Sequence, residues 1–300
     1  MANTSNYEKV VLETVAVSDV GRVRDHNEDA FGYASGDFGS VFIVCDGVGG
    51  NQGGSTASKT AVNSIIDHFS KINGEYNLFR ESREAMNYAN KKILDLASSS
   101  RYLSGMSTTA AFLLVCDQLA LISHLGDSRV YLFRHKRIYQ LTKDHSAIEE
   151  IKDKKMGRVS KAETQELKHV ITRSLGTNKL LVPEVSETFP IYKNDIFLIC
   201  SDGLINQVTE KEIKSILSKY SINDAAQKLV DWANVNGGND NITIQLVKVA
   251  SGPPLPKDYF DDNPVFKNDI KSKTLIYSTV AALIGAIGLL VYAAYKLIMR

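Results

Sequence analysis

The sequence has few cysteines, few prolines and no excess of either charge. Three cysteines in 300 residues cannot form a disulfide framework, and Cys45, Cys116 and Cys200 each lie in an apolar run that predicts a small buried side chain. Lysine and arginine number 35 against 34 acidic residues, so the net charge of +1 gives no reason to expect a nucleic-acid binder. The first 14 residues lack the basic start and apolar core of a secretion signal. We expect a globular chain in a reducing compartment, without a nucleic-acid partner.

Several common site motifs are absent as well. The sequence contains no Cys-x-x-Cys, no His-Glu-x-x-His and no Gly-x-Ser-x-Gly. A glycine-rich loop runs from Asp46 to Gly54 between a predicted strand and a predicted helix. It lacks the Lys-Ser/Thr that ends a P-loop, and the dinucleotide-binding pattern fails at Gln52. This loop is therefore not expected to bind a nucleotide.

A long uncharged segment stands near the end of the sequence. Leu275–Tyr295 holds 21 residues without a charge, and as a helix it would be about 31 Å long, close to the thickness of a bilayer core. The alternative is a buried core helix, but such helices rarely run so long without charge on every face. The segment therefore predicts a transmembrane helix over 275–295.

A proline-rich stretch separates this segment from the body of the chain. Four of the six prolines fall between Pro253 and Pro264, which predicts an extended linker over 251–274 after a domain over 1–250. Since the bulk of the chain precedes the predicted span, we expect a single-pass C-terminal anchor with the domain facing the cytoplasm. The lysines and arginine flanking the span favour this orientation only slightly.

The body of the chain alternates short strands with two pairs of helices. Strand-like runs occur at 10–17, 41–45, 108–115, 120–124, 130–133, 196–200 and 242–249. Helical spacing of apolar residues occurs over 57–69 and 85–97, and capping-box spacing begins at Thr209 and Ser221. Turns rather than crossover helices separate several strands. This predicts an α+β fold with antiparallel sheets and helices outside them.

Aspartates follow two of the apolar strands. Asp46 comes directly after 41–45, and Asp202 follows 196–200 after one serine; Asp240 precedes the last strand. An Asp-Gly after a strand is usually only a turn. If the two strands were neighbours at the centre of a sheet, both carboxylates would lie at one edge and could share an ion. Carboxylate oxygens of this kind suit Mg²⁺ or Mn²⁺.

A series of short motifs identifies a family resemblance. In order they are Arg24-x-x-Asn27-Glu28-Asp29, Asp46-Gly47-Val48-Gly49-Gly50, Gly105-Met106-Ser107-Thr108-Thr109, Gly126-Asp127-Ser128-Arg129, Leu141-Thr142-Lys143-Asp144-His145-Ser146, Ile171-Thr172-Arg173-Ser174-Leu175-Gly176, Ser201-Asp202-Gly203-Leu204 and Asn239-Asp240-Asn241. Each motif is weak alone. Together, over 7–249, they resemble the metal-dependent serine/threonine protein phosphatases of the 2C type (PPM), and most closely the bacterial branch.

This resemblance implies a fold, a metal site and an activity. The fold would be two antiparallel β-sheets sandwiched between helix pairs. The implied ligands of two or three Mn²⁺ or Mg²⁺ ions are Glu28, Asp29, Asp46, the Gly47 carbonyl, Asp127, Asp202 and Asp240. Asp46 would bridge two ions, and Arg24 would bind the substrate phosphate. A metal-bridging water would attack the phosphoryl group in line, without a covalent intermediate.

The implied substrates are proteins carrying phosphoserine or phosphothreonine. The resemblance further implies a monomeric catalytic domain. With the predicted span over 275–295, this domain would be tethered to the membrane, where it would oppose a cognate serine/threonine kinase. The alternative is a non-catalytic membrane scaffold that binds phosphoproteins through a degenerate site. The complete set of acidic ligands favours the enzyme.

The sequence departs from the family at two positions. Many relatives have a histidine, proposed as general acid, where this chain has Val48, and bacterial members often have one at the position of Asn51. His26, Asp144 and His145 are the other candidates for an acid, and each is also readily explained as structural. We therefore expect lower activity or an altered pH profile rather than no activity. The charged stretch 146–169 matches the variable flap of the family, either a solvated loop or a substrate-selecting element.

Overall fold

The computed structural model describes residues 9–49, 52–153, 167, 170–256 and 259. The chain divides into two compact units, Met1–Pro253 and Pro254–Arg300, and the first contains the fold discussed below. No helix of the described residues is long and apolar enough to cross a membrane. The predicted span over 275–295 lies outside the described residues, so it stays a prediction, as do the predicted domain boundaries.

The first sheet of the fold is antiparallel and has five strands in the order β1-β13-β12-β8-β9. These are β1 (Val11–Asp19), β13 (Ile242–Ser251), β12 (Ile196–Cys200), β8 (Arg129–Arg134) and β9 (Arg137–Gln140). β13 continues to Ser251, one residue into the range predicted as linker.

The second sheet is also antiparallel and has the order β10-β7-β6-β3-β2, with β11 paired to β7. Its strands are β10 (Glu184–Val185), β7 (Leu119–Leu125), β6 (Ala110–Cys116), β3 (Gly39–Cys45), β2 (Ala30–Gly36) and β11 (Phe189–Pro190). Two short strands, β4 (Gly47–Val48) and β5 (Ser107–Thr108), pair with each other beside it.

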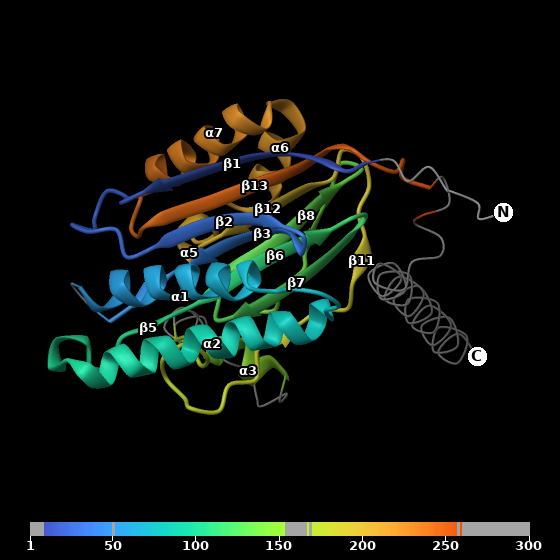
Figure 1. Ribbon diagram of the computed structural model, residues 1–300. Coiled ribbons are helices and arrows are strands. Elements are labelled where there is room, and N and C mark those ends of the chain that lie inside the picture. The colour runs from blue at the N-terminus through green and yellow to red at the C-terminus, as the bar shows by residue number, and fades with distance from the viewer. Residues whose placement is uncertain (1–8, 50–51, 154–166, 168–169, 257–258, 260–300) are drawn as a thin grey trace, which may run out of the picture. The chain divides into compact units, whose positions relative to one another are not determined.

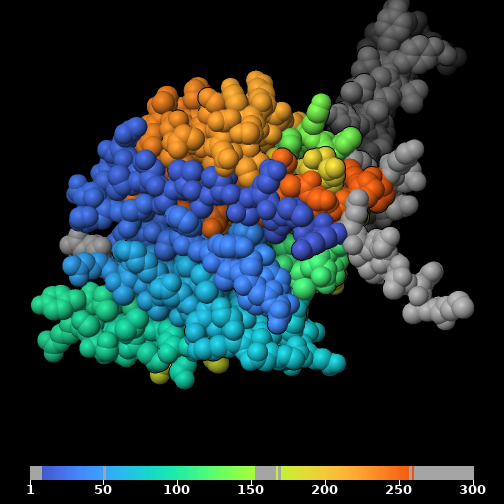
Figure 2. All heavy atoms as spheres, turned by 45° about the horizontal axis from the view of Figure 1, so that its top comes forward, coloured from blue at the N-terminus to red at the C-terminus, as the bar shows by residue number. Residues whose placement is uncertain are grey.

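Two pairs of helices cover the outer faces of the sheets, as Figure 1 shows. The helices α1 (Gly53–Ser70) and α2 (Leu78–Ser99) pack on the second sheet, and α6 (Glu210–Lys219) and α7 (Ile222–Val235) pack on the first. In Figure 2, α6 and α7 (orange) border the N-terminal strand (blue). The shorter helices are η1 (Arg101–Leu103), α3 (Ala147–Asp153) and α5 (Asp202–Ile205). The predicted α+β fold, with antiparallel sheets between helix pairs, is confirmed.

The local rules read from the sequence account for these helices. The apolar residues of α1 and α2 recur every three or four positions and are buried against the second sheet. The predicted capping box is present at α6, where the Thr209 hydroxyl accepts from the Glu212 N–H and the Glu212 carboxylate accepts from the Thr209 N–H. At α7 the Ser221 hydroxyl accepts from the Asp224 N–H.

The central strands are buried on both faces. In β3, Val41, Ile43 and Cys45 belong to the core beneath α1 and α2, while the alternating Phe42 and Val44 are buried on the opposite face. Burial of both faces explains why this strand is a continuous apolar run. Because side chains within such a strand are buried on both faces, a carboxylate can reach solvent only at the end of the strand.

Candidate active site

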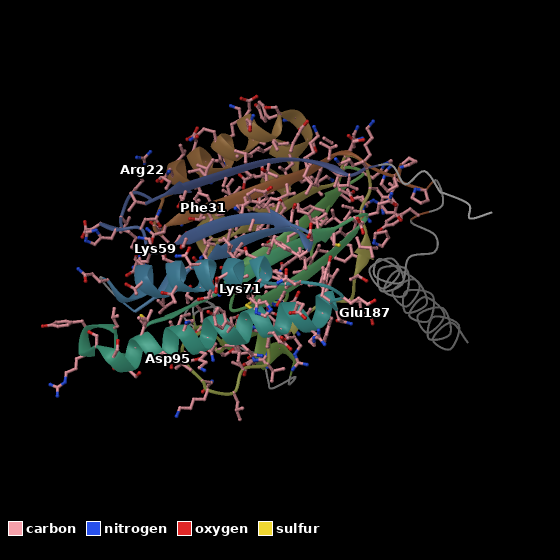
Figure 3. All side chains as sticks on the ribbon, viewed as in Figure 1. Arg22, Phe31, Lys59, Lys71, Asp95 and Glu187 are labelled. Carbon is pink, nitrogen blue, oxygen red and sulfur yellow. The ribbon has the colours of Figure 1, made fainter. Side chains whose placement is uncertain are left out.

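Strand register brings the predicted site residues to one end of the sandwich. Asp29 precedes Ala30, which pairs with Cys45 just before Asp46. In the first sheet, Cys200 pairs with both Ile244 and Arg129, which places the neighbouring Asp202, Asp240 and Asp127 at the same end. Figure 3 labels Arg22 and Lys59 near this end of the molecule, with Lys71 and Glu187 further away from it.

The two strands that end in Asp46 and Asp202 are not neighbours in one sheet. β3 belongs to the second sheet and β12 to the first, so they face each other across the sandwich. The sequence raised neighbouring strands in one sheet only as a condition, and the structure does not meet it, because an apolar run ending in aspartate indicates which end of a strand is polar but not which sheet holds the strand. The consequence for the site is the same, since both carboxylates still meet at one edge of the core.

The backbone of Asp46 is held by two threonines of the segment after η1. The Asp46 N–H donates to Thr109 Oγ1 at 2.9 Å, and the Asp46 carbonyl accepts from the Thr109 N–H and the Thr108 hydroxyl, both at 2.8 Å. Thr109 Oγ1 also shares a hydrogen bond of 2.7 Å with Ser128 Oγ. These contacts tie the Asp46 turn to the turn that carries Asp127, and they use only the backbone of Asp46.

Asp29 and Asp127 are buried carboxylates. Asp29 Oδ2 accepts from the Ser201 hydroxyl at 2.7 Å. Burial is the main cause that raises the pKa of Asp29 to about 7, with the charges of Asp202 and Asp240 adding to it. The pKa of Asp127 is also raised to about 7, first by burial and then by the charges of Asp202 and Asp144.

Asp46 lies among the other four aspartates. Its pKa is raised well above the ordinary value, first by burial and then by the charges of Asp29, Asp202, Asp127 and Asp240. Burial likewise raises the pKa of the neighbouring Glu28. Such a group of carboxylates repels itself unless protons or cations neutralise it.

The cluster fits divalent ions that prefer oxygen ligands. Three of its carboxylate oxygens, Glu28 Oε1, Asp29 Oδ1 and Asp127 Oδ1, are buried without a hydrogen-bond partner in the part of the chain that the structure describes. A buried carboxylate oxygen that lacks a donor is poorly solvated, and a cation would satisfy it. Glycine at position 54 gives Glu28 room, since a Cβ there would come within 2.9 Å of both Glu28 carboxylate oxygens.

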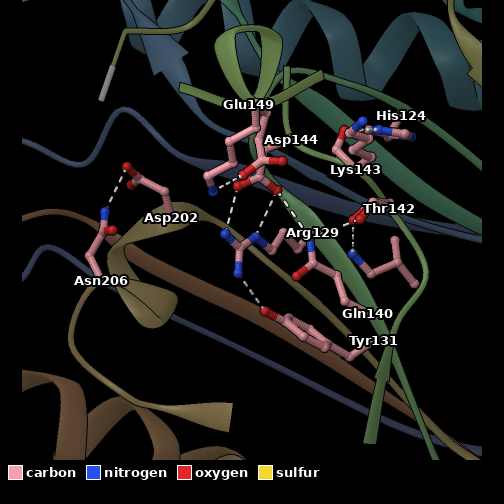
Figure 4. Close-up of polar contacts among 12 residues, drawn as sticks. His124, Arg129, Tyr131, Gln140, Thr142, Lys143, Asp144, Glu149, Asp202 and Asn206 are labelled. Carbon is pink, nitrogen blue, oxygen red and sulfur yellow. Dashed lines mark hydrogen bonds and ion pairs between the residues drawn. The ribbon is translucent and has the colours of Figure 1, made fainter. Parts of the chain in front are cut away.

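Arg24 lies at the rim of this cluster. Its guanidinium donates to Asp240 Oδ2 at 2.8 Å, and both side chains are partly exposed. The structure thus brings the predicted phosphate-binding residue to the predicted ligands, in an ion pair with one of them. Asp202 Oδ2 accepts from the Asn206 amide at 2.9 Å (Figure 4).

A partly buried ion pair supports the same edge of the site. Arg129 donates to both carboxylate oxygens of Asp144 at 2.7 and 2.6 Å, and it also donates to the Tyr131 hydroxyl (Figure 4). With both its oxygens bound to the guanidinium, Asp144 is a structural residue rather than a proton donor. Of the two positions at which relatives have a histidine, Val48 is exposed beside Gly47, and Asn51 lies outside the described residues.

Several residues that build the site received no role from the sequence. Thr109 and Ser201 hold Asp46 and Asp29 as described above. Asn241 accepts from the Glu28 N–H and donates to the carbonyls of Val20 and His26, and so fixes the loop that carries Arg24. All three lie inside the short motifs of the sequence, and this was the only sign of their importance.

Two of the three cysteines are excluded as nucleophiles by their burial. Cys45 and Cys200 are fully buried, as predicted, whereas Cys116 is only partly buried, contrary to the prediction. Burial raises the pKa of the Cys45 and Cys200 thiols, that of Cys200 to about 12. Neither is available as a nucleophilic thiolate at neutral pH.

The fold and the carboxylate cluster are those expected for a 2C-type phosphatase, and comparison with known sequences supports this class. The sequence model of protein phosphatase 2C matches residues 22–243, so the chain belongs to this family and is a phosphatase, as predicted. A serine/threonine phosphatase of Listeria welshimeri is 36% identical over 240 residues, which are 77% of this chain and 93% of the relative.

Solved structures place the chain in the bacterial branch. The serine/threonine phosphatase of S. agalactiae superposes with a TM-score of 0.74 at 27% identity, covering 80% of this chain and all of that one. The catalytic domain of the phosphatase PstP, solved in complex with two manganese ions, gives a TM-score of 0.70 at 30% identity over 80% of this chain and 98% of that domain.

Proposed function

We propose that this chain is a Mn²⁺- or Mg²⁺-dependent phosphatase acting on phosphoserine and phosphothreonine in proteins. The observation that carries the proposal is the buried carboxylate cluster, whose raised pKa values and unpartnered oxygens call for cations. Glu28, Asp29, Asp46, Asp127, Asp202, Asp240 and the Gly47 carbonyl would hold two or three ions. These ions would activate water and neutralise the phosphoryl oxygens.

The residues of the chain supply binding and orientation. Arg24 would turn from Asp240 to the phosphate, which its planar guanidinium can grip through two oxygens. The hydrogen bonds of Thr109, Ser201 and Asn241 keep the acidic groups in place before substrate arrives, so that little reorganisation remains during the reaction.

Release of phosphate from phosphothreonine peptides tests this function. We expect the full chain in detergent to hydrolyse such peptides with Mn²⁺ and to lose activity in EDTA. Small phosphate esters in the same assay separate a protein phosphatase from a general phosphoesterase. A folded, Mn²⁺-loaded chain that binds phosphopeptides but releases no phosphate would support the alternative, a non-catalytic phosphoprotein-binding scaffold.

We further propose that residues 275–295 tether the phosphatase to the cytoplasmic face of a membrane, where it would oppose a serine/threonine kinase. The support is the uncharged run of 21 residues after a proline-rich stretch. We expect the full chain to float with phospholipid vesicles in a density gradient and to stay with them in 1 M salt. A variant lacking 275–295 should remain at the bottom. Equal behaviour of the two chains would contradict the tether.

A further inference from the structure

A second group of titratable side chains lies beside the carboxylate cluster. His124 of β7, His145 and Glu184 of β10 each offer a ligand atom within 4.8 Å of the others, and both histidines are buried. The two imidazole rings are stacked, with their centroids 4.9 Å apart and an interplanar angle of 11°. His145 Nε2 lies 2.9 Å from Glu184 Oε1, and the guanidinium of Arg173 contacts both.

The hydrogen bonds of His145 decide which nitrogen carries its proton. The buried N–H of Gly126 points at His145 Nδ1 at 3.1 Å, so Nδ1 must be the acceptor. The proton of the ring then sits on Nε2, which donates to Glu184. With Nδ1 accepting from an amide and Nε2 protonated, neither nitrogen can ligate a metal. The Arg173 guanidinium beside them also disfavours a cation, so this trio is not a metal site.

His145 satisfies both backbone groups of Gly126. Besides accepting from the Gly126 N–H, it donates its own N–H to the Gly126 carbonyl at 2.9 Å. Gly126 has a φ of +106°, and a Cβ there would meet Thr109 Cγ2 at 2.6 Å, so its backbone is pressed against the threonine that holds Asp46. Asp127 is the next residue. The position of this buried carboxylate therefore depends on how Gly126 is held.

His145 also joins this turn to the start of the segment 146–171. Its carbonyl accepts from the Thr172 N–H at 2.8 Å, and the adjacent Ser146 pairs with Ile171. One residue thus connects the turn of Asp127, both ends of that segment, and β10 through Glu184.

We propose that His145 is a positioning residue of the phosphatase, which orients Asp127 through the hydrogen bond from the Gly126 N–H to its Nδ1. The part of this inference that concerns catalysis rests on the proposed role of Asp127 as a metal ligand. His145 takes no part in proton transfer, although the sequence offered it as a candidate acid.

Two substitutions of His145 separate its contact with the Gly126 N–H from its contact with Glu184. In His145→Asn the Oδ1 atom stands where Nδ1 stood and can still accept from Gly126, but the side chain no longer reaches Glu184. In His145→Gln the amide nitrogen can reach Glu184, but the acceptor for Gly126 is displaced. Amide hydrogen exchange at residues 126–128 of the metal-free protein should therefore be about tenfold faster in His145→Gln than in His145→Asn.

Mn²⁺ binding and kinetics complete the test. Calorimetry should show weaker Mn²⁺ binding in His145→Gln, and its kcat should fall about tenfold below that of His145→Asn with little change in KM. Equal exchange at Gly126 in the two variants would overturn the proposal. If His145→Gln does not fold, His145→Asn is sufficient for the test. Loss of the protection of the Gly126 amide against hydrogen exchange in His145→Asn would also overturn the proposal.

Two controls keep this result separate from the metal assignment. Glu184→Gln removes only the charge of the outer partner and should change exchange at Gly126 by less than about threefold. Asp127→Asn tests the ligand itself: if it binds as much Mn²⁺ as the unaltered chain, the role of Asp127 is wrong. The exchange comparison still judges His145, because it is made without metal.

Discussion

Replacing Asp46 with asparagine should lower kcat on a phosphothreonine peptide by about 10³-fold or more. Asp46 is the carboxylate that feels the charges of Asp29, Asp202, Asp127 and Asp240, so it lies at the centre of the cluster. Asparagine preserves the shape and keeps the backbone bonds to Thr108 and Thr109, but it removes the negative charge that would hold two cations. Phosphate release with saturating Mn²⁺ measures the effect.

A matched control is available on the outer surface of α1. Asp67 is a half-exposed aspartate whose carboxylate pairs with Lys71 and accepts from the Tyr88 hydroxyl, and Asp67→Asn should change kcat less than twofold, about the effect of a surface ion pair. Calorimetry with Mn²⁺ should show weakened binding only in Asp46→Asn. If Asp46→Asn retained both Mn²⁺ binding and turnover, the placement of the metal site at this end of the sandwich would be wrong.

The helices and strands that could be predicted from the sequence are those with a clear pattern of apolar residues. β3 and β12 are continuous apolar runs because they are buried on both faces, and α1 and α2 bury one apolar face against a sheet. β2 was missed because it is partly exposed, with Phe31 and Tyr33 open to solvent, and because it contains glycine at both 32 and 36. The strands β10 and β11 are only two residues long and show no pattern of apolar residues, so they are recognised only by their pairing with β7.

The site divides in the same way between local and long-range information. Motifs could identify the aspartates, because each stands at a strand end with a recognisable turn after it. Motifs could not identify the hydrogen-bond partners of those aspartates, because the partners are distant in the sequence. Arg24 and Asp240 are 216 residues apart, and Ser201 and Asp29 are 172 residues apart. Such contacts depend on sheet order, which single-sequence patterns leave open. The same limit explains why the sequence could not tell whether β3 and β12 belong to one sheet.

Removal of metal should destabilise the protein much more at pH 7.5 than at pH 5.5. The folded-state pKa values of Asp29 and Asp127 are about 7, whereas an unfolded aspartate titrates near 3.9. Between these values the metal-free folded chain binds more protons than the unfolded chain. Its free energy of unfolding is therefore highest, with respect to these groups, below about pH 4 and is lost as the pH rises towards about 7.

Bound Mn²⁺ would take the place of those protons, so its stabilising effect should grow across the same pH window. At a Mn²⁺ concentration about 100-fold above the dissociation constants at pH 7.5, we expect Mn²⁺ to raise the Tm by about 10 °C at that pH. At the same concentration the rise should be only a few degrees at pH 5.5, because protons compete with the ions there. Thermal unfolding of the full chain in detergent, with Mn²⁺ or with EDTA, measures both differences. Asp46→Asn should abolish most of the rise at pH 7.5. A Tm difference that did not change with pH would contradict the argument, because metal binding would then release no protons and the two carboxyls would already be ionised in the metal-free fold.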